Sequence, residues 1–308
     1  MKIFPFKCLV IALLVANVSL LAQGQTQPST DSQEQVESEK GITGFETIQG
    51  TINSDSRIYR LDSTLGWNFN KHFGVFAGVP VYVANVPSSA ITDGTTTTTN
   101  ANHTNSGIGN AYLGFTLTVP NSKLYYASEV TVYAPTGSVA KGLSTGRVGV
   151  DWTNRFDHTF HGLTPFFVGG LSNTALDSAF FARPFTSLGA ISHLEEGAEY
   201  QLIEHLSVGG SGYQIIPFGS QKVFSRLGGE GKGRNPFDTS LVSIGNDLTR
   251  ENGYSTWVAL QPSSIARIEL GYTRSQTFGL NSFAFNLRMN VGKLLRPKRN
   301  NSSAITKE

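Results

Sequence analysis

The chain has 308 residues and contains 33 glycines, while only 15% of its residues are charged and 11% are aromatic. Low charge together with many Gly, Thr, Ser, Asn and aromatic residues favours an all-β protein over a helical one. The 24 basic residues nearly balance the 22 acidic ones, and the sequence has no basic arm or aromatic–basic platform, so nucleic acid is not expected as a partner.

Residues 1–24 are typical of a secretory signal peptide. A short basic region precedes an apolar run of about 15 residues, from Cys8 to Ala22, which is shorter than a membrane-spanning helix of roughly 20 residues. Ala22 and Gly24 are small residues of the kind that a signal peptidase requires. Removal of this segment takes away two lysines and Cys8, the one cysteine of the chain. The exported protein would then have 22 basic and 22 acidic residues, no formal net charge and no disulfide.

The next segment, residues 25–43, is polar and free of aromatic residues, and it is expected to form a disordered leader. From residue 44 to residue 292, apolar and polar residues alternate with a period of two, which predicts β-strands. The predicted strands include 45–52, 57–69, 73–83, 107–119, 125–134, 147–156, 188–202, 265–272 and 283–291. No helical periodicity of any length interrupts this pattern.

These predicted strands have roughly 10–13 residues, which matches the length that a tilted strand needs to cross a bilayer. Short turns alternate with long polar loops, and the long ones lie near 87–106, 136–146, 173–184 and 218–249. We count twelve strands, an even number that returns both termini to the short-turn side. Outer-membrane barrels have this arrangement. The alternative, a secreted β-sandwich, would have shorter strands and more charge on its polar face.

The sequence therefore predicts an all-β transmembrane antiparallel up-and-down β-barrel of about 12 strands in the bacterial outer membrane, with both termini in the periplasm. The barrel would occupy residues 44–292 and precede a polar, basic tail at 293–308. Outer-membrane lipid and the barrel-assembly machinery are the expected partners, and the oligomeric state is left open. The tail lacks the terminal aromatic residue of most bacterial barrels, so either strand 283–291 is an internal assembly signal or assembly differs.

In a membrane barrel the apolar face of each strand meets lipid and the polar face lines the lumen. On strand 125–134, Val130 would face lipid, and Glu129 would face the lumen beside a strand with charged residues on the same face. The candidate lumen-lining residues are Arg60, Tyr112, Tyr125, Glu129, Tyr133, Arg147, Asp151, Arg155, His193, Glu195, Glu199, Arg267, Glu269 and Arg288. A charge in a narrow lumen needs a partner. These residues therefore either fill and stiffen the wall or take part directly in permeation, and both interpretations stay open.

Several short motifs appear in order along the middle of the chain. Gly-Ile-Gly-Asn at 107–110 opens a strand, and Ala-Pro-Thr-Gly at 134–137 ends the next one. Gly142 and Gly146 follow, and then Thr-Pro-Phe-Phe-Val at 164–168 before two glycines. This order resembles the MetA-pathway of phenol degradation family of outer-membrane barrels, although Asn110 stands where the family has an acid. The resemblance covers about residues 105–175. It implies a transporter of small compounds, aromatic ones among them.

An enzyme is not expected. Outer-membrane phospholipases have a His-x-Ser-Asn-Gly motif, whereas residues 103–107 read His-Thr-Asn-Ser-Gly, and the exchange moves the hydroxyl to the opposite face of a strand. No cofactor or metal site is expected either. The favoured function is an outer-membrane transporter or channel for small, hydrophobic or aromatic compounds. The alternatives are a structural or adhesive barrel that acts through its extracellular loops and, less favoured, a barrel lipase.

Overall fold

The computed structural model describes residues 40–54, 56–86, 89–93, 96–100, 103–121, 124–227 and 241–295. The predicted signal peptide, most of the predicted leader and residues 296–308 of the predicted tail lie outside these ranges. The described residues form β-strands, with a short helix, α2 (Val291–Leu295), after the last strand. No helix in the described ranges has both the length and the apolar character needed to cross a membrane.

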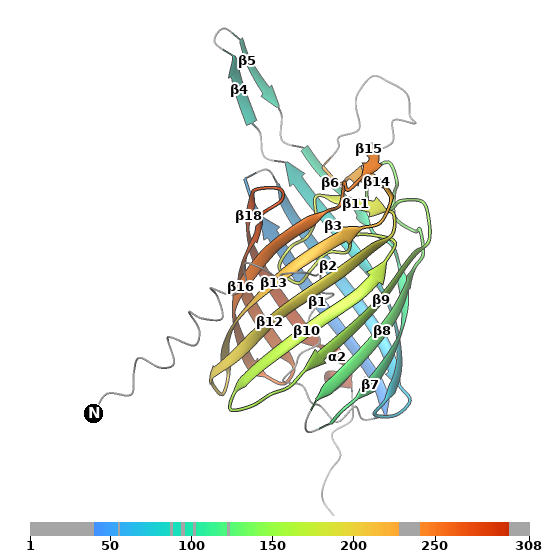
Figure 1. Ribbon diagram of the computed structural model, residues 1–308, viewed down its shortest axis with the longest axis vertical. Coiled ribbons are helices and arrows are strands. Elements are labelled where there is room, and N and C mark those ends of the chain that lie inside the picture. The colour runs from blue at the N-terminus through green and yellow to red at the C-terminus, as the bar shows by residue number, and fades with distance from the viewer. Residues whose placement is uncertain are drawn as a thin grey trace, which may run out of the picture.

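A single antiparallel sheet closes on itself to form a barrel (Figure 1). Closure follows from the pairing of β1 with both β2 and the last strand, β18, and of β2 with β3. The strands of this sheet are β1 (Gly41–Ile52), β2 (Arg57–Asn68), β3 (Phe73–Val86), β6 (His103–Ile108), β7 (Tyr112–Val119), β8 (Tyr125–Tyr133), β9 (Gly149–Asp157), β10 (Leu163–Ser172), β12 (Ile191–Ile203), β13 (Leu206–Pro217), β16 (Glu251–Ser263), β17 (Ala266–Ser275) and β18 (Leu280–Asn290).

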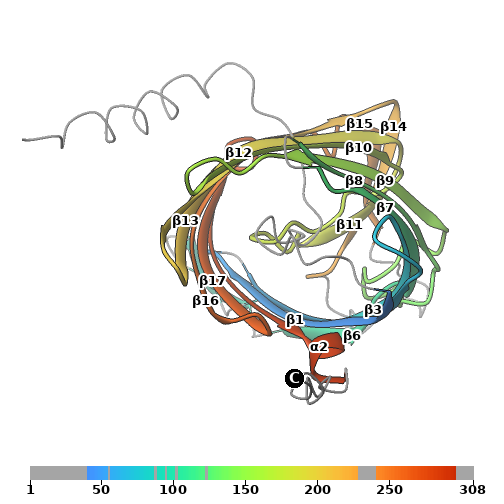
Figure 2. The same cartoon turned by 90° about the horizontal axis from the view of Figure 1, so that it is seen from below.

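Two of these thirteen strands share one position in the wall. The same edge of β3 pairs with β7 through residues 73–78 and with β6 through residues 81–86. The wall thus has twelve positions, and Figure 2 shows the closed ring that they form. The predicted all-β, up-and-down antiparallel barrel of about 12 strands is confirmed.

Several strand boundaries differ from the predicted ones. The first strand begins at Gly41, three residues before the predicted start of the barrel at 44. The predicted strand 107–119 is divided between β6 and β7, because the backbone leaves the ladder at residues 109–111. The predicted strand 188–202 begins instead at Ile191, and Leu188 belongs to a separate short strand, β11 (Phe185–Leu188).

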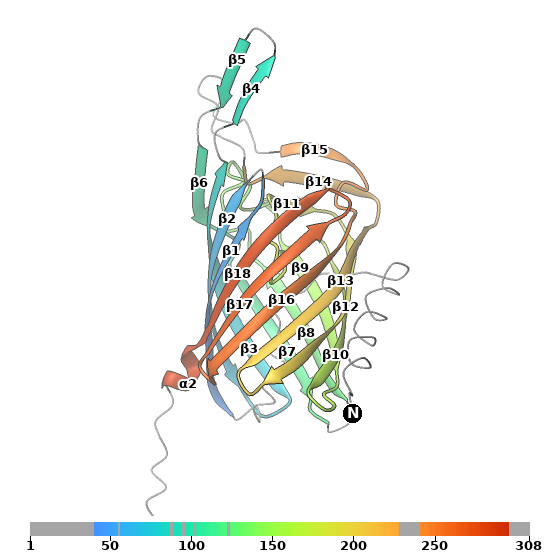
Figure 3. The same cartoon turned by 90° about the vertical axis from the view of Figure 1, so that its left-hand side faces the viewer.

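The two ends of the barrel are unlike. One end, the turn end, has the short connections 69–72, 120–124, 158–162, 204–205 and 264–265. The other end, the loop end, carries β11, β14 (Ser220–Ser225) and β15 (Leu241–Asn246) as a three-stranded sheet, and the hairpin of β4 (Ser89–Asp93) and β5 (Thr96–Asn100) projects beyond it (Figure 1). The first strand starts and the last strand finishes at the turn end, where α2 lies outside the wall (Figure 3).

Large apolar side chains cover the outside of the barrel. On β2 the outward residues alternate with inward ones, and Leu61, Leu65 and Trp67 are all exposed. Trp67, Phe69 and Phe73 form an exposed aromatic group beside a turn at the turn end. A soluble protein would place such residues in its core, whereas a lipid environment selects them for the surface. Together with the closed ladder, which leaves no sheet edge in lipid, this surface makes the fold a transmembrane barrel.

Two acids break the apolar pattern of the outer face. Glu46 of β1 accepts a hydrogen bond of 2.8 Å from the hydroxyl of Ser63 on β2. Glu196 of β12 lies between Phe167 and Gly212 in the strand pairing, and Phe167 is an exposed residue of the outer face. These two outward acids were not predicted, because in each strand they occupy a position that alternation assigns to an apolar residue.

Candidate functional site: the lumen and its inner loop

The connection between β10 and β11 folds into the barrel instead of out into solvent (Figure 2). We call residues 173–184 the inner loop. The side-chain nitrogen of Gln49 on β1 donates hydrogen bonds to the carbonyl oxygens of Ser178, at 2.7 Å, and Ala179, at 3.0 Å. The amide of Ala182 donates to the hydroxyl of Thr51, at 2.9 Å, on the same strand. These contacts hold the loop backbone directly against the inner wall.

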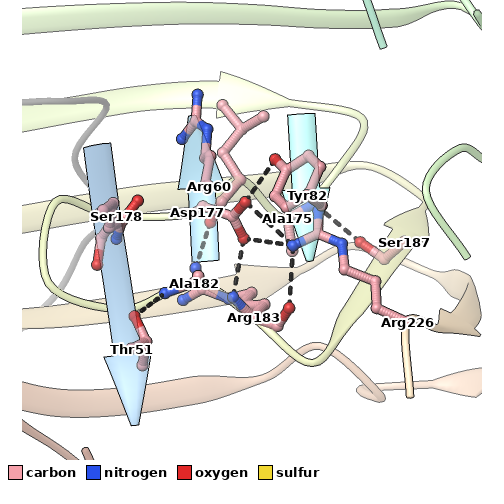
Figure 4. A network of polar contacts seen from close by, with 12 residues as sticks. Thr51, Arg60, Tyr82, Ala175, Asp177, Ser178, Ala182, Arg183, Ser187 and Arg226 are labelled. Atoms are coloured by element: carbon pink, nitrogen blue, oxygen red, sulfur yellow. Dashed lines mark hydrogen bonds and ion pairs between the residues drawn. The ribbon is translucent and has the colours of Figure 1, made fainter. Parts of the chain in front are cut away.

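A buried carboxylate anchors one side of the inner loop (Figure 4). Asp177 accepts hydrogen bonds from the hydroxyl of Tyr82 on β3, at 2.7 Å, and from Arg226, which follows β14. The amide of Arg183 donates to the same carboxylate at 2.8 Å. Burial by itself would raise the pKa of Asp177, but the guanidiniums of Arg226 and Arg60 outweigh it and hold the pKa below its usual value.

The other side of the inner loop is anchored by a second ion pair. Arg183 donates to one oxygen of Glu251 on β16 from Nε, at 3.2 Å, and from Nη2, at 2.8 Å. The hydroxyl of Tyr213 on β13 donates to the other oxygen at 2.8 Å. Arg183 and Glu251 are both completely buried. Because a buried charge that loses its partner is strongly destabilising, this pair fixes the loop in one position.

An aromatic contact completes the attachment of the inner loop. The ring of Phe180 stacks on Trp257 of β16, with centroids 5.0 Å apart and planes at 18°. Phe166 of β10 also lies beside Trp257, at a centroid distance of 6.3 Å. Trp257 is only 8% exposed, so it packs against the loop and does not offer a free face to the lumen.

Most of the predicted lumen-lining residues point inward and contact one another. Arg60 pairs with Asp62, which also accepts a hydrogen bond of 2.7 Å from Tyr112. The Nε2 atom of His193 lies 2.9 Å from an oxygen of Asp151. The Arg60–Asp62 pair lies within β2, and the other two contacts join next-but-one strands. They match the interpretation that lumen charges are paired. Whether any of them acts in permeation stays a prediction.

Near the turn end the predicted charges form a second group. Arg267 of β17 donates to Glu199 of β12 at 2.7 Å and to Glu269 at 2.8 Å. Arg155 donates to Asp157 at 2.8 Å, and its guanidinium lies 4.7 Å from the centre of the Phe166 ring.

The remaining predicted residues also have defined positions. Tyr125, Glu129 and Tyr133 lie on the inward face of β8, and Glu195 is buried on the inward face of β12. Arg288 of β18 is inward, with its guanidinium 4.1 Å from the ring centre of Phe45.

Arg147 is an exception and corrects the prediction. Its side chain is exposed, and it lies in the loop before β9. The strand begins two residues later, at Gly149, because Gly149 is the first residue to pair with Tyr133 of β8. Arg147 therefore does not share the inner wall with Glu129, whereas Asp151 and Arg155 do.

The sequence analysis missed the four residues that anchor the inner loop, namely Asp177, Arg183, Arg226 and Glu251. The segment 173–184 was interpreted as one of the long polar loops on the outside. One signal was present: Ala-Phe-Phe-Ala at 179–182 is an apolar run inside that loop, and all four residues are buried. Over the described ranges there is no group of three or more His, Cys, Asp or Glu residues that would hold a metal ion.

No family model matches the chain, and no curated protein sequence matches it. The resemblance to the phenol-degradation family thus stays a prediction. Similar solved structures include an outer membrane channel from Pseudomonas putida F1, with 12% identity, a TM-score of 0.49, and 82% of this chain and 96% of that chain covered. The KdgM porin has 7% identity, a TM-score of 0.41, and coverages of 80% and 98%. The NanC porin has 7% identity, a TM-score of 0.43, and coverages of 79% and 98%. At such identities and TM-scores, function has to be argued from this chain's own residues.

Proposed function

We propose that this chain is a channel of the bacterial outer membrane for small solutes, with the inner loop as its constriction. The observation that carries the proposal is the inner loop itself, which crosses into a polar lumen and is held there by side chains from β1, β3 and β16. A barrel that served only as a scaffold would not need a loop fixed inside it by two buried ion pairs. A channel does, because a fixed constriction sets the size of what passes.

The orientation proposed for the channel follows the usual asymmetry of bacterial barrels, with short turns in the periplasm and long loops outside. The turn end, where the first strand starts and the last strand finishes, would then be periplasmic. The loop end, with the projecting β4–β5 hairpin, would face the exterior (Figure 3). Labelling of a cysteine introduced at residue 92, in intact cells, tests this orientation with a reagent that does not cross the outer membrane.

Planar-bilayer recording of the refolded protein tests the channel proposal directly. We expect small, discrete conductance steps. A matched pair of variants tests the constriction: replacement of residues 176–181 by a short Gly-Ser linker should raise the conductance, whereas deletion of the hairpin residues 89–100 should not. A barrel that shows heat-modifiable gel mobility but conducts no ions and passes no solute into liposomes would overturn the proposal.

The proposed solutes are small compounds, aromatic ones among them. Tyr112 and Tyr133 lie on the inward faces of β7 and β8, with their ring centroids 5.9 Å apart. Tyr125 lies on the same face of β8, closer to the turn end. Aromatic side chains along a lumen favour flat solutes through stacking. Liposome swelling should therefore be faster with aromatic than with aliphatic amino acids of the same charge, and Tyr125→Ala with Tyr133→Ala should remove that preference. Equal rates in the unaltered protein would contradict this part of the proposal.

A second candidate function rests on the β4–β5 hairpin, which extends well beyond the rest of the barrel (Figure 1). A projecting hairpin with an unpaired edge can bind an outside partner by strand addition. Cells that carry a deletion of residues 89–100 would then lose adhesion but keep the conductance of the channel. Unchanged adhesion in these cells would remove this candidate.

A further inference from the structure

The charged groups of the lumen differ sharply in exposure. Nine carboxylates face inward from the described strands or belong to the inner loop, and eight of them are 7% exposed or less: Asp62, Asp151, Asp157, Asp177, Glu195, Glu199, Glu251 and Glu269. The ninth, Glu129, is only half-buried. Its side chain accepts a hydrogen bond of 3.1 Å from Thr131 on its own strand and forms no ion pair with any described residue. Glu129 is thus the most exposed of these nine carboxylates.

The arginines of the interior divide in a similar way. Arg155, Arg183, Arg226 and Arg267 are buried and ion-paired. Arg60 is half-buried and paired with Asp62. Arg288 is half-buried, and its guanidinium lies over the ring of Phe45.

Glu129 and Arg288 lie on opposite walls of the barrel. The order of strands around the wall is β18, β1, β2, β3, β7 and β8, so five of the twelve steps separate β18 from β8. Both side chains lie on the inward faces of their strands. Inward charges of opposite sign on opposite walls of a lumen create a transverse field, and walls of low dielectric strengthen it.

The inward-facing acidic groups outnumber the basic ones, which favours cations in the lumen. The inside of the barrel has nine carboxylates and six guanidiniums, a formal excess of three acidic groups. Part of this excess lies on one wall, where Glu129, Asp151 and Glu195 occupy β8, β9 and β12. A lumen lined by one sign of charge concentrates counter-ions.

We propose that Glu129 and Arg288 are the charge filter of the channel, and that Glu129 gives it a preference for cations and cationic solutes. This inference rests on the proposed channel function and names the residues that determine its selectivity. The buried ion pairs of the lumen then hold the wall and the inner loop in place, while Glu129 and Arg288 act on the solute.

Reversal potentials in planar bilayers under a KCl gradient test the filter. We expect the unaltered channel to prefer K⁺. Glu129→Gln should lower the ratio of cation to anion permeability by about twofold or more, and Arg288→Gln should raise it. The matched control is Glu196→Gln, the same change on the outer face, which should leave the ratio unchanged. Anion preference in the unaltered channel, or equal ratios for Glu129→Gln and Glu196→Gln at normal conductance, would overturn the filter while leaving the channel proposal intact.

A chemical version of the test avoids dependence on one substitution. The one cysteine of the chain, Cys8, lies in the predicted signal peptide, so Glu129→Cys would place a single thiol in the exported protein. A negatively charged thiol reagent should restore the preference for cations, and a positively charged one should reverse it. No change with either reagent, once mass spectrometry shows that the thiol has reacted, would overturn the inference. Absence of any conductance in the unaltered, folded protein would instead count against the proposed function itself.

Discussion

The guanidinium of Arg226 donates from one nitrogen, Nη1, to both carboxylate oxygens of Asp177, at 2.8 Å and 3.0 Å. The two residues are 49 positions apart, one in the inner loop and one after β14. The same nitrogen also donates to the carbonyl oxygen of Arg183, at 2.9 Å. Figure 4 shows Tyr82, Arg183 and Arg226 around the carboxylate of Asp177. The position of the inner loop is therefore linked to a segment of the loop end that is not part of the barrel wall.

Asp177→Asn should release the inner loop. The variant leaves Arg226 buried without its counter-charge, which costs about 3–5 kcal/mol where such a pair is broken. The wall itself does not depend on this contact, so we expect a folded barrel with a larger and noisier single-channel conductance. Asp247→Asn is the matched control, because its pair with Arg250 is exposed, at 59% and 48%, and contributes little. Identical conductance traces for both variants would contradict the anchoring role of Asp177.

The inner loop should also respond to acid. The pKa of Asp177 lies below its ordinary value of 3.8, so the carboxylate stabilises the docked loop fully above that value and less as the pH falls through its folded pKa. We expect steady conductance from neutral pH down to about pH 4 and loop release only at lower pH. Recordings across this range test the expectation. The transition should be missing in Asp177→Asn, and a transition near neutral pH would assign the response to another group.

Phe180→Ala should loosen the loop on its other side. The change removes a ring that is 7% exposed and stacked on Trp257, a loss of about 3–5 kcal/mol for a buried aromatic side chain. Trp257 would then meet water, and its fluorescence should shift to the red. Phe283→Ala, on the outer face where Phe283 is 66% exposed, is the control that should leave the fluorescence of Trp257 unchanged.

Val130→Lys tests which face of β8 meets lipid. Val130 is exposed on the outer face next to the inward Glu129, and a lysine at the bilayer midplane costs about 2–4 kcal/mol in a barrel. We expect less assembled, heat-modifiable protein in the outer-membrane fraction. Val148→Lys changes an even more exposed valine, which lies in the loop before β9, and this variant should assemble normally. Normal assembly of both variants would show that the faces of β8 have been assigned wrongly.

Much of the barrel could be predicted because the alternation of apolar and polar residues determines most of its strands. The period of two fixes both strand and face, and it placed Glu129 and Val130 on opposite sides of β8 as the structure has them. Arg147 was placed wrongly because alternation does not say where pairing begins, which depends on the neighbouring strand. The two outward acids were missed because no local rule predicts a lipid-facing carboxylate.

The inner loop shows a deeper limit of sequence reasoning. Whether a long connection folds inward or outward depends on partners that are remote in the chain, such as Gln49, 129 residues from Ser178, and Glu251, 68 residues from Arg183. Composition made segment 173–184 look like an outside loop, although its apolar run at 179–182 indicated burial. A polar loop with four consecutive apolar residues is a signal to search the predicted lumen for partners.

The contacts that hold the inner loop come from both the first and the last strands of the barrel. Gln49 and Thr51 belong to the first strand, while Glu251 and Thr273, whose hydroxyl donates to the carbonyl of Phe180, belong to the last quarter of the wall. The loop therefore bridges the seam at which the beginning and the end of the chain meet. Its full set of contacts can form only after that seam has closed, so we expect the loop to dock late in the assembly of the barrel.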